Sequence, residues 1–474
     1  MEVHVSLVGR KDLTGEIYRQ LRRAILDGRL PPGARLPPTR ELARRLSVSR
    51  TTVTVAYDRL TGEGFVTART GAGTFVSEAI AGPPGQPRPA GGALRPRPLW
   101  KAITVPRVVE ERLAEFDFRP GIPDAGLFPY QTWRRLLAQQ LRPAAVAGGV
   151  YGDPAGQPDL RRAIARHVGV SRGVQTVAGQ VVVTNGTQQA VDLVARVLLE
   201  PGDRVAVETP GYRPLRRLLA SLGAEVVPVA VDAEGLVVEA IPPGVRLITV
   251  SPSHQFPLGM AMSLPRRMAL LAWAERHGAA IVEDDYDSEF RYSGRPIEPV
   301  QTLDQHGRVL YVGSFSKTML ATLRLGFVVV PEPLVEAVRA AKFVADWHTS
   351  LPTQAALAGF IDQGYLARHI RRMRRVYQER HQLIVGVLAD RFTDRVKLIP
   401  SSTGLHVTAM VPGVTQAELT AVLERAWAAG VGVMALSRWD AGPPSQPGLV
   451  LGYGAIPTAR IEEGLRRLRR CFDG

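Results

Sequence analysis

The spacing of apolar and polar positions divides the 474-residue chain into three parts. In residues 10–77, Ile17, Leu21 and Ile25 recur at the spacing of an amphipathic helix. Residues 78–98 read "EAIAGPPGQPRPAGGALRPRP", where proline and glycine oppose helices and sheet hydrogen bonds and no apolar period is present. Residues 110–474 alternate apolar runs with amphipathic segments. The pattern predicts an N-terminal domain, a linker and a larger body.

The N-terminal part predicts a helix-turn-helix followed by a hairpin. After the first helix, a short helix is expected around Leu42, and Ser49 can cap a third helix. The stretch "GFVTARTGAGTFVS" predicts two short strands joined at a glycine turn, with Arg69 at the base of the hairpin. The outward face of the third helix carries side chains that can donate to phosphates and base edges, namely Arg50, Thr51 and Thr54.

The net charge of the chain gives moderate support to a nucleic-acid partner. The formal net charge is +15, and residues 1–77 hold 13 Lys and Arg against 7 Asp and Glu, a net +6. This excess favours a polyanionic partner, although a helical bundle with a solvated basic face is the alternative. The single cysteine, Cys471, excludes an internal disulfide and a multi-cysteine metal cluster, and no metal is assigned. With neither a membrane-spanning run nor a signal-peptide pattern, we expect a cytoplasmic protein without membrane contact.

The body predicts an α/β fold with a mostly parallel sheet covered by helices on both faces. In "VVVTNGTQQAVDLVARVL" a strand, a turn at Gly186 and a helix beginning near Thr187 form an anion site of backbone N–H groups. Polar side chains also follow other strands, near the edge where open α/β sheets bind ligands. They are Tyr212, His254, Gln255, Asp284 and Tyr286.

Lys317 stands in "GSFSKTML", directly after another apolar strand. A lysine beside a phosphate site, an acidic residue and aromatic rings is what pyridoxal phosphate requires. Lys317 would be its Schiff-base lysine, made nucleophilic by burial and by Arg324. Asp284 would face the pyridine nitrogen, Tyr286 would donate to the ring hydroxyl, and Tyr212 would stack on the ring. The phosphate would lie among Arg324, Thr187, Gln188 and Ser314.

Two stretches resemble known families. "RLPPTRELARRLSVSRTTVTVAYDRLTGEG" is similar to the winged helix of GntR-type regulators. The resemblance implies contacts to double-stranded promoter DNA, with Gly71 tipping the wing into the minor groove and the other contacts from Arg40, Ser49, Arg50, Thr51 and Thr52. From about Phe116 onward, the chain order of phosphate turn, stacking tyrosine, His-Gln loop, Asp/Tyr pair and Ser314-x-Ser316-Lys317 resembles the fold type I aminotransferases. That likeness implies a smaller C-terminal α+β subdomain.

The same resemblance implies a homodimer. In that family the tyrosine of a stretch such as "VYGDPAGQPDLRRAIA", here Tyr151, reaches the phosphate of the neighbouring subunit's cofactor. The combination of both domains resembles the MocR subfamily of bacterial regulators, down to "PSHQFPLG", "EDDYDSEFRY" and "RHIRRMRRVYQERH". The last run is either a DNA-facing patch or an interface helix, and we favour the interface.

The chain departs from working aminotransferases at two positions. Phe256 stands where those enzymes carry an asparagine on the ring hydroxyl, and Val450 stands where they carry the arginine that grips the substrate carboxylate. Arg213, Arg216 and Arg438 are the alternative grips. We therefore expect a regulator that senses pyridoxal phosphate, as in the pyridoxine-synthesis regulators of the subfamily, or a small amine or amino acid. The alternative is an active aminotransferase with an accessory DNA-binding module.

Overall fold

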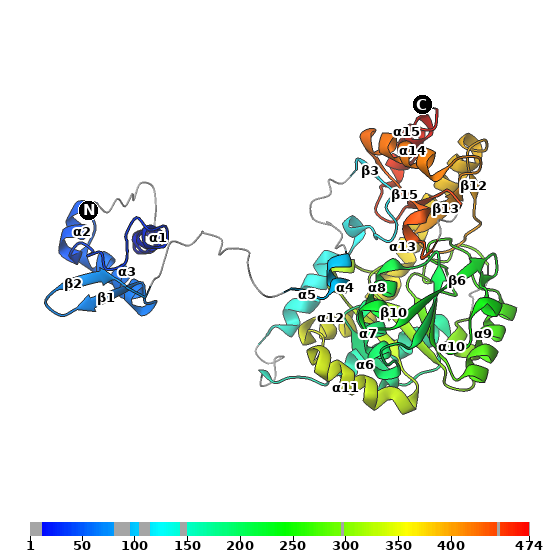
Figure 1. The fold of residues 1–474 in the computed structure, drawn as a ribbon, viewed down its shortest axis with the longest axis horizontal. Coiled ribbons are helices and arrows are strands. Elements are labelled where there is room, and N and C mark those ends of the chain that lie inside the picture. The colour runs from blue at the N-terminus through cyan, green and yellow to red at the C-terminus, as the bar shows by residue number, and fades with distance from the viewer. Residues whose placement is uncertain are drawn as a thin grey trace. The chain divides into compact units, whose positions relative to one another are not determined.

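A computed structural model describes residues 12–79, 95–103, 114–142, 149–294, 298–442 and 446–473. The contacts within the chain separate two compact units, Met1–Lys101 and Ala102–Gly474, and each is described here by itself (Figure 1). Most of the expected linker, residues 80–94, lies outside the described residues, as do residues 10 and 11. The domain boundaries at residues 77, 98 and 110 therefore stay predictions.

The first unit is a three-helix winged helix. Its elements are α1 (Leu13–Leu26), α2 (Thr39–Leu46), α3 (Arg50–Gly62), β1 (Val66–Arg69) and β2 (Gly73–Val76). The Ser49 hydroxyl caps α3 by accepting from the Thr52 N–H at 3.1 Å, and Ser47 adopts a left-handed conformation in the turn that separates α2 from α3. Strands β1 and β2 pair antiparallel. The predicted helix-turn-helix and hairpin are both confirmed.

An eight-stranded sheet forms the centre of the second unit. Its order is β4 (Val181–Thr184), β11 (Gly326–Val329), β10 (Val309–Ser314), β9 (Ala280–Asp285), β8 (Val245–Val250), β5 (Arg204–Thr209), β6 (Glu225–Asp232) and β7 (Gly235–Leu236). The five strands from β10 to β6 run parallel, whereas β11 is antiparallel to both of its neighbours. The mostly parallel sheet predicted from the sequence is confirmed.

Helices cover both faces of this sheet. They are α5 (Tyr130–Gln140), α6 (Pro158–Arg172), α7 (Thr187–Leu198), α8 (Arg213–Ser221), α9 (Leu264–His277), α10 (Val300–Leu303), α11 (Val335–Asp346) and α12 (Leu351–Asp362). Because side chains alternate along a strand, Val181 and Val183 of β4 enter one apolar cluster, with α5, α6 and α12. Val182 enters the opposite cluster, with α7 and α8. The sheet is thus the middle layer of three.

The chain ends in a smaller α+β subdomain, drawn in yellow to red in Figure 1. The long helix α13 (Tyr365–Arg391) leads into an antiparallel sheet ordered β12 (Lys397–Leu398), β13 (His406–Met410), β16 (Gly448–Gly452), β15 (Met434–Ala435). Helices α14 (Gln416–Ala428) and α15 (Thr458–Arg470) complete it, while β14 (Val431–Gly432) pairs with β3 (Phe116–Asp117), which follows the short helix α4 (Pro98–Ala102). The predicted subdomain is confirmed.

Helix α13 contains the run "RHIRRMRRVYQERH". One of its faces is buried, and there Arg380 donates to the Asp124 carboxylate at 2.6 Å. Arg371, Arg372, Arg374 and Arg375 are exposed. Its role as an interface helix stays a prediction. Among the described residues, no helix has both the length and the apolar character needed to cross a membrane.

Candidate cofactor and DNA-binding sites

Lys317 lies in the loop after β10, and its side chain is largely buried. Its Nζ atom donates to the Gly121 carbonyl at 2.5 Å. Burial lowers the pKa of the Lys317 ammonium, and Arg324 lowers it further, whereas Asp287 and Asp284 oppose that effect. The net direction is downward, which makes the amine more available as a nucleophile at neutral pH. The expected influence of burial and Arg324 is therefore present.

Asp284, at the end of β9, is one of two acidic residues whose charges act on this amine. The residue is 9% exposed, and its Oδ1 accepts a long hydrogen bond of 3.5 Å from the Thr187 hydroxyl. Burial, followed by the charge of Asp285, raises the pKa of Asp284 to about 7, while Lys317 lowers it. A buried carboxyl with so weak a partner is suited to a protonated ring nitrogen, which would supply a short charge-assisted bond.

The predicted phosphate site forms where β4 turns into α7. Gly186 has φ +83° and precedes the first residue of α7, so the free N–H groups of that helix begin at Thr187. Arg324 donates to the Asn185 carbonyl at 2.8 Å, and a side chain at Gly186 would lie only 3.0 Å from its guanidinium. The structure thus brings Arg324 to an N-terminus that attracts anions.

The other residues predicted to contact the phosphate differ in their exposure and in their hydrogen-bond partners. Ser314 is buried and donates to Ser316 at 2.9 Å, so these two hydroxyls hold each other at the end of β10. Gln188 is exposed on the first turn of α7. Asn185, which the sequence analysis did not select, donates to Asp346 of α11 at 2.7 Å. This bond ties the phosphate turn to a neighbouring helix.

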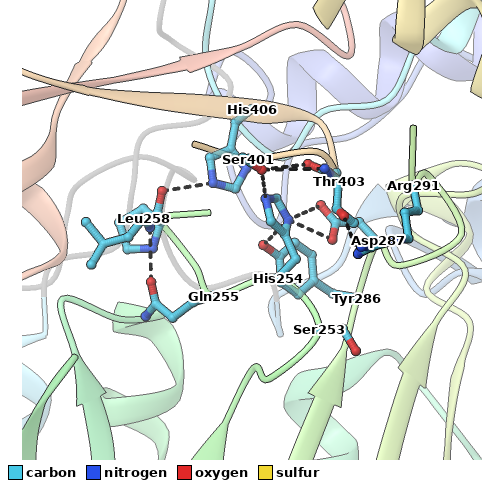
Figure 2. Close-up of polar contacts among 12 residues, drawn as sticks. Ser253, His254, Gln255, Leu258, Tyr286, Asp287, Arg291, Ser401, Thr403 and His406 are labelled. Carbon is cyan, nitrogen blue, oxygen red and sulfur yellow. Dashed lines mark hydrogen bonds and ion pairs between the residues drawn. The ribbon is translucent and has the colours of Figure 1, made fainter. Parts of the chain in front are cut away.

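His254, Tyr286 and Asp287 form a polar group in which His254 and Asp287 are buried (Figure 2), and the charge of Asp287 acts on Lys317. The His254 Nδ1 lies 3.0 and 3.1 Å from the two Asp287 carboxylate oxygens, and the Tyr286 hydroxyl lies 3.0 Å from the same nitrogen. His406 stacks obliquely on His254 at 4.7 Å and bonds the Pro257 carbonyl through Nε2. Burial places the pKa of His406 well below its ordinary value. Tyr286 thus has a protein partner that the sequence analysis did not expect.

His254, Asp287 and His406 each offer one ligand atom within 4.8 Å of the others. No metal-ligand motif is recognisable for these three residues in the sequence, because His406 follows Asp287 by more than a hundred residues. The direct bond between His254 and Asp287 satisfies both groups without an ion. The expectation that no metal binds stays a prediction.

Gln255 is used differently from the expectation. It is 1% exposed, and its Nε2 donates to the carbonyls of Pro210 and Phe256 while its Oε1 accepts from the Leu258 N–H. All of its polar atoms are therefore occupied by backbone, and Gln255 orders the loop after β8 instead of offering an amide to a ligand. Nothing in the local sequence distinguishes these two roles.

Tyr212 and Phe256 line the site from the loops after β5 and β8. Tyr212 is 39% exposed, and the Phe256 ring stands nearly perpendicular to it at 6.2 Å. Val450 in β16 is fully buried in an apolar cluster with Leu258, Leu436 and Trp439. The position of the expected carboxylate grip is therefore packed with hydrocarbon. Of the alternative arginines, Arg216 donates to the Asp440 carbonyl at 2.7 Å, and Arg213 and Arg438 are exposed.

Tyr151 lies on the surface, 71% exposed. Its ring stacks on Trp347 at 4.2 Å, at the end of α11 and next to Asp346. Phe343 packs on Trp347 at 4.8 Å, and Val344 is 82% exposed. We call these four residues, Tyr151, Phe343, Val344 and Trp347, the α11 apolar patch. Exposed apolar groups so close together are typical of an interaction surface.

In the winged helix, the predicted DNA-contact residues fall into two groups. Arg40, Arg50 and Thr51 are exposed, and Thr54 is half-buried on α3. Ser49 and Thr52 instead bond each other at 2.7 Å as part of the helix cap. In the hairpin, Arg69 pairs with Glu78 at 3.1 Å and lies over the Phe75 ring, while Gly71 has φ +76° in the exposed turn. Glycine suits that left-handed position.

Comparison with known proteins agrees with both halves of this geometry. Residues 144–437 match the model of "Aminotransferase class I and II", and residues 13–76 match "Bacterial regulatory proteins, gntR family". The chain is 40% identical, over 96% of its length and 93% of the relative, to the probable rhizopine catabolism regulatory protein MocR of Rhizobium meliloti. It is 32% identical, over 93% of its length and 91% of the relative, to the pyridoxine biosynthesis transcriptional regulator PdxR of Corynebacterium glutamicum.

Among solved structures, the chain resembles the Pyrococcus horikoshii kynurenine aminotransferase in complex with PMP. The TM-score is 0.70 at 26% identity, over 80% of this chain and 98% of that one. The N-terminal DNA-binding unit is shared with the regulators, whereas the body is shared with regulators and enzymes alike.

Proposed function

The chain belongs to the MocR subfamily of GntR-type bacterial transcriptional regulators, and from that premise we propose that it binds pyridoxal phosphate and controls promoter binding through it. The ligand that it senses is pyridoxal phosphate itself or a small amine or amino acid that reacts with it. The observation that carries this proposal is the buried Lys317 amine beside Asp284 and Arg324.

The residues present fit the cofactor. Lys317 would bind it covalently, Asp284 would accept from its ring nitrogen, and Tyr212 would cover one ring face. Thr187, Gln188, Ser314, Ser316 and Arg324 would hold the phosphate. When bound, pyridoxal phosphate supplies a carbonyl group that reacts reversibly with primary amines. The long 3.5 Å hydrogen bond of Asp284 and the helix N-terminus after Gly186 support this fit, because a protonated ring nitrogen and a phosphate would each supply a stronger partner there.

Promoter binding rests on the winged helix. Arg50 and Thr51, at the start of α3, are exposed and carry donors suited to phosphates and base edges, and Arg40 adds a guanidinium from α2. Ser49 and Thr52, which cap the helix, would fix its N-terminus and so the orientation of Arg50 and Thr51. Gly71 would let the hairpin turn approach the minor groove closely.

We further propose that the body has no physiological turnover. Transamination requires the substrate to be held so that its Cα–H bond aligns with the ring, and a carboxylate–arginine pair normally supplies that hold. Val450 and the apolar cluster around it cannot. The alternative, an active aminotransferase with an accessory DNA-binding module, is favoured only by the likeness of the body to a working enzyme.

The active form would be a homodimer that buries the α11 apolar patch, with Tyr151 reaching the partner's phosphate site. A dimer would also provide two arrangements of the DNA-binding units, and a ligand can shift such an equilibrium only if it prefers one of them.

The testing experiment is a titration of promoter DNA with the full-length protein, with and without pyridoxal phosphate. The DNA is a duplex selected by the protein from a random library. The proposal expects the dissociation constant to change at least fivefold with the cofactor and expects Lys317→Ala to lose the change. An unchanged constant for the parent protein would contradict cofactor sensing, and absence of any selected duplex would contradict promoter binding.

A further inference from the structure

One nitrogen of His254 serves two neighbours at once. Its Nδ1 lies 3.0 Å from Asp287 Oδ1 and 3.0 Å from the Tyr286 hydroxyl oxygen. An ionised carboxylate can only accept, so the hydrogen between His254 and Asp287 resides on Nδ1. A ring nitrogen that carries a hydrogen has no lone pair to receive a second one. The Tyr286 oxygen can therefore only share the Nδ1 hydrogen as an acceptor, which leaves its own hydrogen free for another group.

The surroundings of His254 hold this arrangement in place. His254 and Asp287 are 2% and 1% exposed. A side chain at Gly404 would collide with the His254 ring and the Asp287 carboxylate, and one at Gly259 would lie 3.4 Å from Nε2. The Ser401 hydroxyl lies 3.3 Å from Nε2 and 3.3 Å from the Thr403 carbonyl, so its one hydrogen is within reach of both acceptors (Figure 2). The ring thus has a fixed orientation and a defined tautomer.

The free hydrogen of Tyr286 matters because of Phe256. The Phe256 ring stands perpendicular to Tyr286 at 6.1 Å and has no donor. Working aminotransferases place an asparagine amide there, on the ring hydroxyl of the cofactor. In this chain the ring hydroxyl would depend on Tyr286 without that amide.

Resting on the cofactor assignment above, we propose that His254 and Asp287 are a positioning pair that fixes Tyr286 as a hydrogen-bond donor toward the ring oxygen of the bound cofactor. His254 accomplishes this by occupying the lone-pair side of the Tyr286 oxygen, and Asp287 accomplishes it by holding the hydrogen of His254 on Nδ1. Through Tyr286, the pair thereby supplies a hydrogen bond to the ring oxygen in place of the asparagine amide.

The measurement is the pH midpoint of the visible absorbance of the full-length protein loaded with pyridoxal phosphate. A donor to the ring oxygen withdraws electron density and weakens the hold of that oxygen on the proton of the adjacent nitrogen joined to Lys317. Loss of the donor therefore raises the midpoint. Asp284, Asp287 and Arg324 also act on this nitrogen through their charges. The variants Tyr286→Phe and His254→Leu leave these three charges unchanged.

Tyr286→Phe and His254→Leu should each raise the midpoint by about one pH unit, the size of one hydrogen bond. Because both remove the same donor, the double variant should show no larger shift. His254→Asn retains an N–H near the Nδ1 position and should restore most of the parent midpoint. His381→Asn, a half-buried histidine bonded to the Ser401 carbonyl, is the matched control and should leave the midpoint unchanged.

A second route restores an amide donor at position 256. Phe256→Asn supplies an amide donor and should lower the midpoint, and in that background His254→Leu should have a smaller effect. Additive shifts for Tyr286→Phe and His254→Leu, or equal midpoints for the parent and His254→Leu, would overturn the pair while leaving the cofactor assignment intact. A parent protein without a Lys317-dependent visible band would overturn both.

Discussion

Phe256 and Val450 belong to one apolar cluster, although 194 positions separate them in the chain. Val450 is fully buried in β16, and Phe256 packs against the edge of this cluster, perpendicular to Trp439 at 5.5 Å. These are the two positions at which the sequence departs from working aminotransferases. Both departures replace a polar side chain with an apolar one, and both fall in this single cluster, which lies where an amino-acid carboxylate would be expected.

This cluster leads us to expect at most trace transamination. The loaded protein, offered a panel of amino acids and amines with a keto-acid acceptor, should form product far below the ~10 per second typical of enzymes. The reason is that Val450, at the position of the expected arginine, has no guanidinium with which to align the substrate carboxylate. Turnover near the enzymatic value for any pair of substrates would contradict the regulator assignment of the body.

Lys317→Ala should abolish the visible absorbance of the cofactor-loaded protein and the adduct that borohydride traps. The low-lying pKa of the buried Lys317 amine is the physical reason to expect reaction there. Lys397→Ala, which changes an exposed lysine of β12, is the control and should retain both signals. A trapped adduct of equal yield in Lys317→Ala would show that another amine reacts.

Asp284 should make the stability of the cofactor-free protein decrease as the pH rises. Its pKa is raised from 3.8 to about 7, so between these values the unfolded chain has released a proton that the folded chain retains. Unfolding then becomes more favourable with increasing pH across that window. Asp284→Asn should remove this component and raise the melting temperature at pH 8 by at least about 2 °C. Thermal melts from pH 4 to 8 check this, and parallel curves for both proteins would refute it.

Arg50→Ala should weaken binding to the selected duplex by about 1 to 3 kcal/mol if Arg50 contacts a base, without changing the cofactor absorbance. Arg50 lies exposed at the first position of α3, where nothing in the winged-helix core depends on it. Arg29→Ala, at an arginine already bonded to Asp27 at 2.8 Å, is the control. Equal affinities of Arg50→Ala and parent would remove Arg50 from the interface.

Val344→Asp should convert the proposed homodimer to a monomer, because it places a charge in the α11 apolar patch. Val170→Asp, on α6, is the matched control, since Val170 is even more exposed at 90%. Sedimentation or light scattering gives the two masses. A dimeric Val344→Asp would place the subunit interface elsewhere.

Three of the predicted cofactor residues lie near one another in the structure, and they share one property. Thr187 and Lys317 closely follow a buried strand, Asp284 lies at the end of one, and parallel strands bring their carboxyl ends to one edge of the sheet. The fold of both units could also be predicted from neighbouring positions in the chain, because apolar periodicity is a local signal.

The residues that were missed owe their position to contacts between distant segments. Gly121, which accepts from Lys317, lies almost two hundred positions before it, and His406 comes from the C-terminal sheet. Asp287 stands one position after Tyr286, but only the approach of His254 gives it a partner. Gln255 was assigned to the ligand because its neighbour fits that role, whereas its amide is fully used by the backbone.

The last turn of α11 joins two features that have so far been considered separately. The Asp346 carboxylate accepts from Asn185 and Gln189, at the phosphate turn, and from Lys342. The next residue, Trp347, has φ +65° and carries the Tyr151 ring on the molecular surface. A bound phosphate would therefore act on Asp346 through the phosphate turn, and a second subunit would contact the adjacent residue, Trp347. By thermodynamic linkage, if the bound cofactor raises the affinity between the subunits by some factor, the monomers that form on dilution must bind the cofactor more weakly by the same factor.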